Sequence, residues 1–345
     1  MHSVLNPRDS KVIIDEFINP LLTSRRRRAG KVSAHYEALW QTIETLYTAG
    51  GKRLRPYLTL LSYQAFGGDS LETILPAAAA QELTHLALLI HDDIIDRDLI
   101  RYGVRNITGQ FIDAYSQIIK DEADRRHYAE SAAILAGDLL FSEAYVLVGT
   151  SGAEELHTAL FGVLGGELLD TEAAFRPDRA DPLVIAVQKT ASYSFTGPLL
   201  TGAKLAGASN EQCNTIRALA EQVGIGFQLQ DDLIGVFGDE AVTGKSTDGD
   251  IREGKFTILI EEFLAKADPS ARKEFDDLFG KKNATEEEIA RVRQLIIESG
   301  AKTAVEQRIG EYRSSALELL KELDFKSEID AAFTSLIDLC LNREF

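Results

Sequence analysis

The chain has 345 residues, of which 45% are hydrophobic and 8 are proline, and its formal net charge at pH 7 is −17. This charge argues against a nucleic-acid partner, because phosphate backbones are bound by an excess of Lys and Arg. Since the two cysteines lack CxxC partners and no signal peptide or membrane span is evident, we expect a cytoplasmic protein without an integral membrane segment.

Apolar residues recur at spacings of three and four along most of the chain, and most of these segments end near a glycine, as helices commonly do. The predicted helices are residues 31–51, 55–68, 74–95, 129–150, 154–175, 181–207, 210–238, 254–267 and 286–300. Residues 120–130 are expected to be an exposed connection, and residues 269–288 a variable surface segment. With no evident strand and no linker, residues 1–345 are predicted to form one all-α domain.

The helix "AAAAQELTHLALLIHDDII" is apolar almost all round, which predicts a helix buried in the middle of a bundle. It ends in a stretch with Asp92, Asp93 and Asp96. Asp92 and Asp96 share one helix face, and Asp93 lies about 100° around it. Like charges at this spacing destabilise a helix, and a divalent cation with oxygen ligands is the simplest way to offset the repulsion.

A second acidic pair, Asp231 and Asp232, ends another apolar helix. Two such helices facing each other would form a strongly negative cavity mouth. Divalent cations would neutralise it and could hold a phosphate group, because Mg²⁺ commonly bridges carboxylates and phosphate oxygens. Basic residues that could complement two anionic groups are Lys52, Arg53, Arg55, Arg101, Lys189 and Lys245. Either acidic motif alone would be a weak signal, and the combination is specific.

Six motifs, in this order, are "GGKRLRP", "THLALLIHDDIIDRDLIRYG", "LAGDLL", "QKTASYSF", "GFQLQDD" and "GDEAVTGKSTDGDIREGK". As a set the sequence resembles the trans-isoprenyl diphosphate synthases, or polyprenyl synthetases, over roughly residues 30–310. The resemblance implies a single-domain isoprenoid-synthase bundle around a deep central cavity and a homodimer. It also implies condensation of isopentenyl diphosphate with an allylic diphosphate (dimethylallyl, geranyl or farnesyl diphosphate).

The resemblance also implies roles for individual residues. The ligands of Mg²⁺, with three ions per site or with Mn²⁺ in their place, would be Asp92, Asp93, Asp96, Asp231 and Asp232. The allylic diphosphate would be bound by Arg101, Lys189 and Lys245, and isopentenyl diphosphate by Lys52, Arg55 and His85. Thr190 and Gln228 would place polar oxygens beside the developing carbocation, while Asp250 and Lys255 would close the second site.

Two positions depart from the family pattern. The second acidic motif has Gly235 where a third aspartate is usual, and a metal ion could then be held by two carboxylates and waters, because Mg²⁺ often keeps several waters. Tyr102 stands where a second arginine is usual before glycine. A phenol can donate one hydrogen bond to substrate but supplies no charge, so binding of isopentenyl diphosphate is expected either to be weaker or to rely more on Lys52 and Arg55.

The length of the product would depend on what blocks the tunnel beneath the first acidic motif. Toward the helix N-terminus the lining positions would be Leu88, Ala87 and then Thr84. One helical turn is about 5.4 Å, close to the length of one prenyl unit. Ala87 is small where a bulky aromatic residue would stop the chain at about fifteen carbons, so a product of twenty or more carbons is predicted, with geranylgeranyl diphosphate favoured.

Two alternatives belong to other functional classes. A class I terpene cyclase would share the fold, but its Asn/Ser/Glu metal triad is absent, since the positions four and eight residues after Asn214 are Ala218 and Gln222. A non-catalytic partner subunit of a prenyl synthase would be expected to have lost metal ligands, whereas the first motif is intact. Activity of the purified chain alone separates these alternatives.

Overall fold

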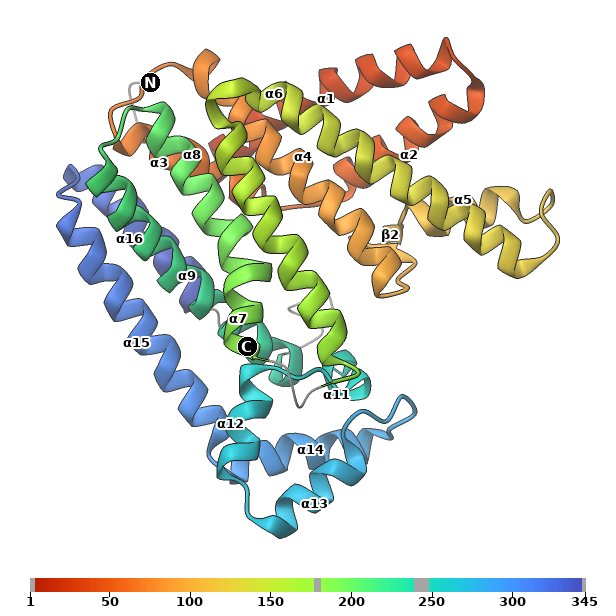
Figure 1. Cartoon of the computed structure of the whole chain (residues 1–345), viewed down its shortest axis with the longest axis vertical. Helices are drawn as coiled ribbons and strands as arrows, with labels where there is room; N and C mark the ends of the chain where they lie inside the picture. The colour runs from red at the N-terminus through yellow and green to blue at the C-terminus, as the bar shows by residue number, and fades with distance from the viewer. Residues whose placement is uncertain (1–3, 177–180, 239–247, 343–345) are drawn as a thin grey trace. The chain divides into compact units, whose positions relative to one another are not determined.

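The computed structural model describes residues 4–176, 181–238 and 248–342, and this part of the chain is almost entirely helical (Figure 1). The predicted all-α fold is confirmed. The chain divides into two compact units. Unit 1 comprises the residues up to Leu156 together with Thr201–Gly207, and unit 2 comprises His157–Leu200 and the residues from Ala208 onward.

Unit 1 is built around one buried helix. Its elements are α1 (Pro7–Gly30), α2 (Ala34–Ala49), α3 (Leu54–Ala65), α4 (Leu71–Ile95), β1 (Ile100–Arg101), β2 (Val104–Arg105), α5 (Ile107–Tyr115) and the first part of α6 (Glu122–Ala173). Helix α1 packs against α2, α3 and α4, and α3 packs along α4. Most of α4 between Ile74 and Ile90 is buried, as its apolar composition predicts.

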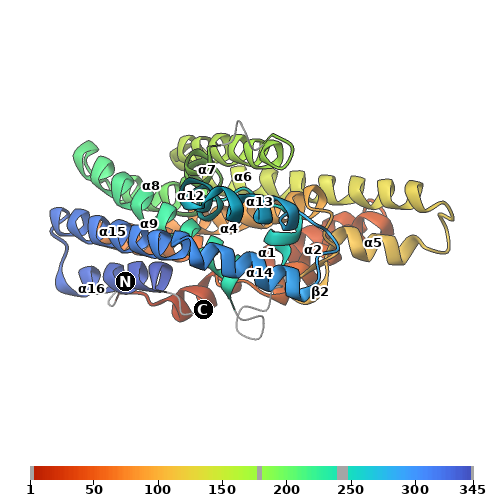
Figure 2. The ribbon, with the colours of Figure 1, turned by 90° about the horizontal axis from the view of Figure 1, so that it is seen from below.

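Unit 2 contains the rest of α6 and the C-terminal helices. Its further elements are α7 (Pro182–Ile185), η2 (Ala186–Thr196), α8 (Gly197–Leu205, as far as Leu200), α9 (Asn210–Phe237), α11 (Gly249–Glu253), α12 (Ile258–Lys266), α13 (Pro269–Leu278), α14 (Glu286–Glu298), α15 (Ala301–Glu322) and α16 (Ser327–Leu341). Helices α9, α15 and α16 lie side by side (Figures 1 and 2), and the π-helix η2 packs against α9. The core of unit 2 therefore surrounds α9.

Polar caps explain where several helices begin. The Ser209 hydroxyl accepts a hydrogen bond from the backbone of Gln212, whose side chain accepts one from the backbone of Ser209, and Thr285 and Glu288 form the same reciprocal box. Such caps satisfy backbone N–H groups that have no partner within the helix. These local signals set the helix starts before any long-range contact is made.

Parts of the secondary structure differ from the sequence-based prediction. The exposed connection predicted at 120–130 is wrong, because Asp121 accepts a hydrogen bond from the backbone N–H of Asp124 and α6 begins at Glu122. Residues 269–288 contain α13 and the start of α14. Helices α1, α15 and α16 were not predicted. The short hairpin β1–β2 was also missed, since two residues per strand are too few to show alternation.

Two helices have the length and apolar composition of a membrane span, although no continuous span was expected from the sequence. Most of the apolar stretch in α4 is buried within the protein, as in the core helix of a soluble domain. The apolar stretch in α6 is less buried, and several of its large side chains are exposed. Length and apolar composition alone are weak evidence for a membrane segment, because the core helix of a soluble protein has both. The expected absence of a membrane segment stays a prediction.

Candidate active site

The first acidic motif lies at the C-terminal end of α4 in unit 1. Asp92 and Asp93 are in the last turn of the helix, and Asp96 is its C-cap residue. The C-terminus of a helix carries partial negative charge, so three carboxylates at this end are held against both their mutual repulsion and the helix dipole. The motif therefore needs a cationic partner.

In the structure that partner is Arg101, on the first strand of the hairpin. Its Nε donates to Asp93 Oδ1 at 2.8 Å, and its Nη2 donates to the same oxygen and, at 3.4 Å, to Asp92 Oδ2. Burial nevertheless raises the pKa of Asp93 to about 6, against the opposing effect of Arg101. A carboxylate that one arginine compensates only in part can accept further positive charge.

The structure offers one test of whether this motif fits a metal ion. Asp93 is 2% exposed, and its Oδ2 is buried without a hydrogen-bond partner. A buried acceptor oxygen without a partner costs stability, and a proton, a water molecule or a cation would satisfy it. Within the described ranges, however, no three His, Cys, Asp or Glu side chains are close enough together to hold a metal ion. The unpartnered oxygen of Asp93 thus fits a hard cation such as Mg²⁺, and it is not the oxygen that Arg101 contacts.

Two of the residues predicted to bind isopentenyl diphosphate, Arg55 and His85, lie near each other in unit 1. Lys52 is exposed, Arg55 and His85 are half-buried, and burial together with Arg55 and Arg101 lowers the pKa of His85 well below its usual range. His85 is therefore a neutral hydrogen-bonding group near three guanidinium groups, those of Arg55, Arg101 and Arg53. This cluster is positively charged and suits an anion.

Tyr102 occupies the tip of the hairpin. Both Tyr102 and Gly103 have positive φ, at 54° and 75°, as the central residues of a type I′ turn require. A Cβ added to Gly50 would lie 2.7 Å from Cγ of the Tyr102 ring, so Gly50 leaves room for this ring. Although 40% of Tyr102 is exposed, burial of its phenol group and the nearby Glu82 raise its pKa. Tyr102 is thus a neutral group beside Arg55.

In unit 2 the predicted residues Lys189 and Thr190 lie on η2. A π-helix is wider than an α-helix and is frequent at functional sites. Glycines on the neighbouring helices α6 and α9 make room for η2. A Cβ added to Gly166 of α6 would lie 2.3 Å from the backbone N of Lys189. A Cβ added to Gly224 of α9 would lie 2.4 Å from Cβ of Ala191. This close packing fixes the backbone of η2 from which the Lys189 and Thr190 side chains extend.

A chain of hydrogen bonds joins three predicted residues of unit 2. Thr190 Oγ1 donates to Gln228 Oε1 at 2.5 Å, and Gln228 Nε2 donates to Asp232 Oδ1 at 2.7 Å. Asp232 is 5% exposed, and burial raises its pKa to about 7 despite the opposing effects of Gln228 and Lys255. The second acidic motif therefore also contains a buried carboxyl group that an added cation would stabilise.

Two acidic residues of α6 were missed by the sequence-based reasoning. Lys189 Nζ donates to Asp170 Oδ2 at 2.5 Å and lies 2.9 Å from Glu167 Oε2. Burial opposes ionisation of Asp170, but Lys255 and Lys189 together lower its pKa. Burial likewise opposes the charge of Lys255, but Asp250 and Asp170 raise its pKa. The only sequence signal for this pair is an acidic face on an otherwise apolar helix.

The remaining predicted residues lie on α4, on α9 and, in one case, outside the residues that the structure describes. Thr84, Ala87 and Leu88 lie on α4, where Thr84 and Ala87 are fully enclosed and Leu88 is half-buried. Lys245 lies outside the described residues. Asp231 is on α9 next to Asp232 and is exposed.

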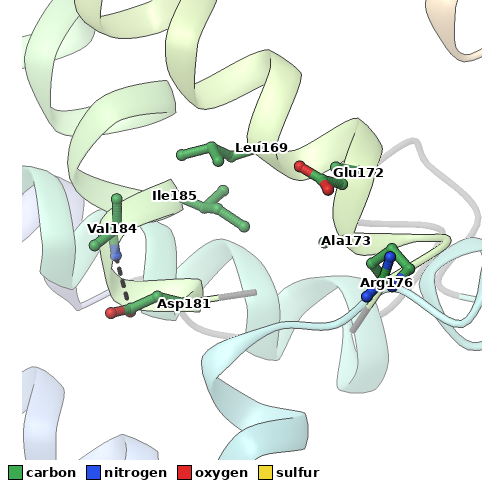
Figure 3. A pocket seen from close by; sticks show the side chains of 7 residues that line it. All are labelled: Leu169, Glu172, Ala173, Arg176, Asp181, Val184 and Ile185. Atoms are coloured by element: carbon green, nitrogen blue, oxygen red, sulfur yellow. Dashed lines mark hydrogen bonds between the residues drawn. The ribbon is translucent and has the colours of Figure 1, made fainter. Parts of the chain in front are cut away.

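Unit 2 also contains a small pocket (Figure 3). It has a volume of about 110 Å³ and is lined by Leu169, Glu172, Ala173, Arg176, Asp181, Val184 and Ile185. Figure 3 shows the Asp181 carboxylate accepting the backbone N–H of Val184, which caps α7. Binding sites for small molecules usually measure about 300–1,000 Å³. This pocket is therefore too small for a prenyl diphosphate.

Comparison with known proteins places this chain in a family. The sequence profile of the polyprenyl synthetase family matches residues 36–296. The chain belongs to the polyprenyl synthetase family. The geranylfarnesyl diphosphate synthase of Aeropyrum pernix is 32% identical over 96% of this chain and 98% of the relative. The geranylgeranyl diphosphate synthase of Methanosarcina mazei is 31% identical over 90% of this chain and 91% of its own.

The fold of this polyprenyl synthetase is also that of solved relatives. The geranylgeranyl pyrophosphate synthase of Corynebacterium glutamicum, in complex with isoprenyl diphosphate and magnesium, superposes with a TM-score of 0.89. The two proteins are 29% identical over 99% of this chain and all of the other. The predictions of a trans-isoprenyl diphosphate synthase enzyme and of an isoprenoid-synthase helical bundle are confirmed.

The structure gives a physical reason for the glycine in the second motif of this polyprenyl synthetase. A Cβ added to Gly235 would lie 2.1 Å from Asp250 Oδ2 and 3.1 Å from its Cγ. The carboxylate of Asp250 therefore occupies the space that a third aspartate of the motif would need. Because that carboxylate ends a flexible side chain, a larger residue at 235 would displace it rather than prevent folding.

Replacing Gly235 with the aspartate that is usual at this position is expected to lower activity. The Gly235→Asp variant should lose about tenfold in kcat/KM, because it displaces Asp250 and adds a like charge beside it. Steady-state kinetics measures this loss, and Gly235→Asp combined with Asp250→Ala should recover part of it. Activity of Gly235→Asp equal to or above that of the unmodified protein would show that displacement of Asp250 does not impair the reaction.

Proposed function

We propose that this polyprenyl synthetase condenses isopentenyl diphosphate with an allylic diphosphate in the presence of Mg²⁺. The product is a trans-polyprenyl diphosphate of twenty or more carbons, and geranylgeranyl diphosphate is the favoured product. The relatives named geranylgeranyl and geranylfarnesyl diphosphate synthases support this range of lengths. Dimethylallyl, geranyl and farnesyl diphosphate are the allylic substrates that we propose.

Bound Mg²⁺ supplies Lewis-acid stabilisation of the negative charge that grows on the leaving diphosphate. Asp92, Asp93 and Asp96 of unit 1, with Asp231 and Asp232 of unit 2, would hold the ions, and we propose three ions per site, with Mn²⁺ as a substitute. Carboxylate oxygens are the ligands that Mg²⁺ prefers.

The other side chains would bind and orient the two substrates. Arg101, Lys189 and Lys245 would bind the allylic diphosphate, and Lys255 would support it through its buried positive charge. Lys52, Arg55, His85 and Tyr102 would bind isopentenyl diphosphate. Thr190 and Gln228, already hydrogen-bonded to each other, would direct their oxygens to the allylic cation. The proton released after carbon–carbon bond formation would pass to the departed diphosphate, so no general base is assigned.

One observation carries this proposal. Each acidic motif contains one buried aspartate, Asp93 or Asp232, whose pKa is raised because burial outweighs the cations and hydrogen bonds around it. A buried carboxylate is costly to stability unless it is paired. A buried aspartate stands at the end of an apolar helix in each unit. Both positions are explained if Asp93 and Asp232 bind a cation during function.

The purified protein with Mg²⁺, isopentenyl diphosphate and farnesyl diphosphate tests the proposal. Mass spectrometry should detect a C20 or longer prenyl diphosphate, and chelation of Mg²⁺ should abolish its formation. Cyclic hydrocarbons in its place would indicate a terpene cyclase. The absence of any product from the chain alone, with product appearing on addition of a second synthase subunit, would indicate a non-catalytic partner subunit.

Two substitutions on α4 should shorten the product by different amounts. Ala87→Phe should stop elongation at about fifteen carbons, whereas Thr84→Phe, nearly one turn of about 5.4 Å farther from the aspartates, should stop it at about twenty and so shorten only products that are longer than geranylgeranyl diphosphate. The reason is that each turn of helix matches about one prenyl unit along the tunnel. Products are separated by chromatography after removal of the diphosphate. Identical product lengths in both variants and the unmodified protein would show that α4 does not line the growing chain.

Exposed apolar residues on α6 support the proposed homodimer. In unit 2, Phe161 and Leu168 lie seven residues apart and therefore on one face of α6, and they are 77% and 70% exposed. Large apolar patches of this kind usually contact another protein or a membrane. We infer that a second copy of the chain covers this face of α6.

We also propose that the two units work as one catalytic domain, because the family profile covers parts of both. Cytoplasmic localisation stays a proposal that the two free, buried cysteines support, since disulfides are rare in reducing compartments.

A further inference from the structure

The three basic residues of "GGKRLRP" differ sharply in their surroundings. Lys52 is exposed and has no ion-pair partner among the residues that the structure describes, and Arg55 is half-buried. Arg53, which lies between them in the sequence, is only 4% exposed. The middle residue therefore has its side chain inside the protein, while its neighbours lie nearer the surface.

The Arg53 guanidinium group joins three helices of unit 1 to the start of α3. Its Nε donates to Asp15 Oδ1 of α1 at 2.8 Å, and its Nη1 donates to Glu82 Oε1 of α4 at 3.1 Å. Nη2 donates to the backbone carbonyl of Tyr47, in the last turn of α2, at 2.8 Å. Arg53 Cζ also lies 3.9 Å from the centre of the Tyr47 ring, whose hydroxyl donates to Asp15 at 2.6 Å.

These contacts hold a strained turn between α2 and α3. Arg53 has a φ of 53°, in the left-handed region that residues with a Cβ rarely adopt. Such a conformation persists only where the surrounding structure enforces it. Gly51 has a φ of 106°, and a Cβ there would lie 2.3 Å from Arg53 Nη1. The buried guanidinium group and the glycine together set the path of the backbone through Lys52.

The same network reaches the other residues proposed to bind isopentenyl diphosphate. Glu82 is three residues before His85 on α4, so the two side chains share a helix face. The carbonyl of Gly50 accepts a hydrogen bond from Arg53 Nη1 at 2.7 Å, and the ring of Tyr102 packs over Gly50. Two carboxylates already balance the charge of Arg53, so its guanidinium group does not serve a substrate anion.

We propose that Arg53 is a positioning residue for isopentenyl diphosphate: its ion pairs with the half-buried Asp15 and the buried Glu82 hold the α2–α3 turn so that Lys52 and Arg55 bind the diphosphate. This inference rests on the proposed function. Misplacement of binding groups by about 1 Å can cost about 100-fold in rate, so a residue that only shapes the turn can have a large effect.

The test is Arg53→Ala, with kinetics for both substrates and calorimetric titration with isopentenyl diphosphate alone. The KM and Kd for isopentenyl diphosphate should rise at least about tenfold, while the KM for farnesyl diphosphate should change less than about twofold. Guanidinium chloride at low millimolar concentration should restore part of the affinity by occupying the vacated site. Equal rises in the KM of both substrates, or an unchanged Kd for isopentenyl diphosphate, would overturn the proposal.

Matched variants separate positioning from stability. Arg25 of α1 forms a bidentate ion pair with Glu143, at 2.6 and 2.9 Å, in the same unit. Arg25→Ala should lower the unfolding temperature without changing the KM for isopentenyl diphosphate, and a rise equal to that in Arg53→Ala would contradict the proposal.

Milder variants keep the test decisive if Arg53→Ala does not fold. Asp15→Asn and Glu82→Gln each weaken one ion pair and should raise the KM for isopentenyl diphosphate about three- to tenfold. Unchanged values in both would overturn the inference. Failure of the unmodified protein to form product would instead contradict the proposed function, whereas the calorimetric titration tests the role of Arg53 without turnover.

Discussion

Asp92→Ala is expected to reduce kcat by at least about 10³-fold while leaving the helical content unchanged. Loss of one group that stabilises developing charge typically costs about 10²–10³ in rate, and Asp92 would be a ligand of the ions that stabilise the leaving diphosphate. The fold should tolerate the change, because Ala is a good helix former and removal of a negative charge from a helix C-terminus is favourable. Single-turnover kinetics and circular dichroism measure the two effects.

Glu72→Ala is the matched control for this variant. Glu72 is exposed in the first turn of the same helix, α4, at the end opposite to Asp92. A carboxylate at a helix N-terminus is favourable, so Glu72→Ala should lower stability slightly and leave turnover unchanged. Undiminished turnover in Asp92→Ala, or an equal loss in Glu72→Ala, would count against the metal assignment.

Asp232→Asn is expected to change activity and stability in opposite directions. The variant should lose at least about 10²-fold in kcat, because it removes the charge of a proposed metal ligand. The metal-free protein should become more stable at pH 8, because Asn removes a buried charge and can still accept the hydrogen bond from Gln228.

The pH dependence of stability follows from the sign of the pKa shift. Burial raises the pKa of Asp232 to about 7 in the folded protein, above the ordinary value of 3.8. Between these values the folded state binds more protons than the unfolded state, so the stability of the metal-free protein falls as pH rises toward and through 7. One pKa unit corresponds to about 1.4 kcal/mol. Asp232→Asn should flatten this dependence in chemical denaturation at pH 5 and pH 8.

A second acidic pair in the same unit supplies the control. Asp276 and Asp277 precede Leu278 as Asp231 and Asp232 precede Leu233, but both residues of the α13 pair are exposed. Asp277→Asn should therefore leave activity, stability and pH dependence unchanged. An Asp232→Asn variant that is no more stable than the unmodified protein at pH 8 would contradict this account. It would show that the buried Asp232 carboxylate does not destabilise the metal-free protein.

The sequence was informative where the function depends on spacing along one helix. The positions of Asp92, Asp93 and Asp96 at the end of a buried helix follow from apolar residues that surround that helix on all sides. Gln228 was expected to share a face with Asp231, and the structure shows its hydrogen bond with Asp232, one residue further. Both are neighbours within one turn, and periodicity alone does not choose between i+3 and i+4.

The sequence was uninformative where partners come from different helices. Lys189 pairs with Glu167 and Asp170 because the π-helix η2 packs closely on α6, and no local pattern predicts a π-helix of this length. Arg101 meets Asp93 through a hairpin with strands of only two residues. The position of Asp250 beside Gly235 likewise depends on how α11 packs against α9. Such contacts require the tertiary structure.

The most direct test of the central claim is a crystal structure of the protein with Mg²⁺ and a non-reactive thio analogue of an allylic diphosphate. We predict ions liganded by Asp92 and Asp96 and by Asp231 or Asp232, all bound to oxygens of the same diphosphate, with Arg101 moved from Asp93 to the substrate. A diphosphate bound without metal, or aspartates of either motif directed into solvent in that complex, would contradict the account.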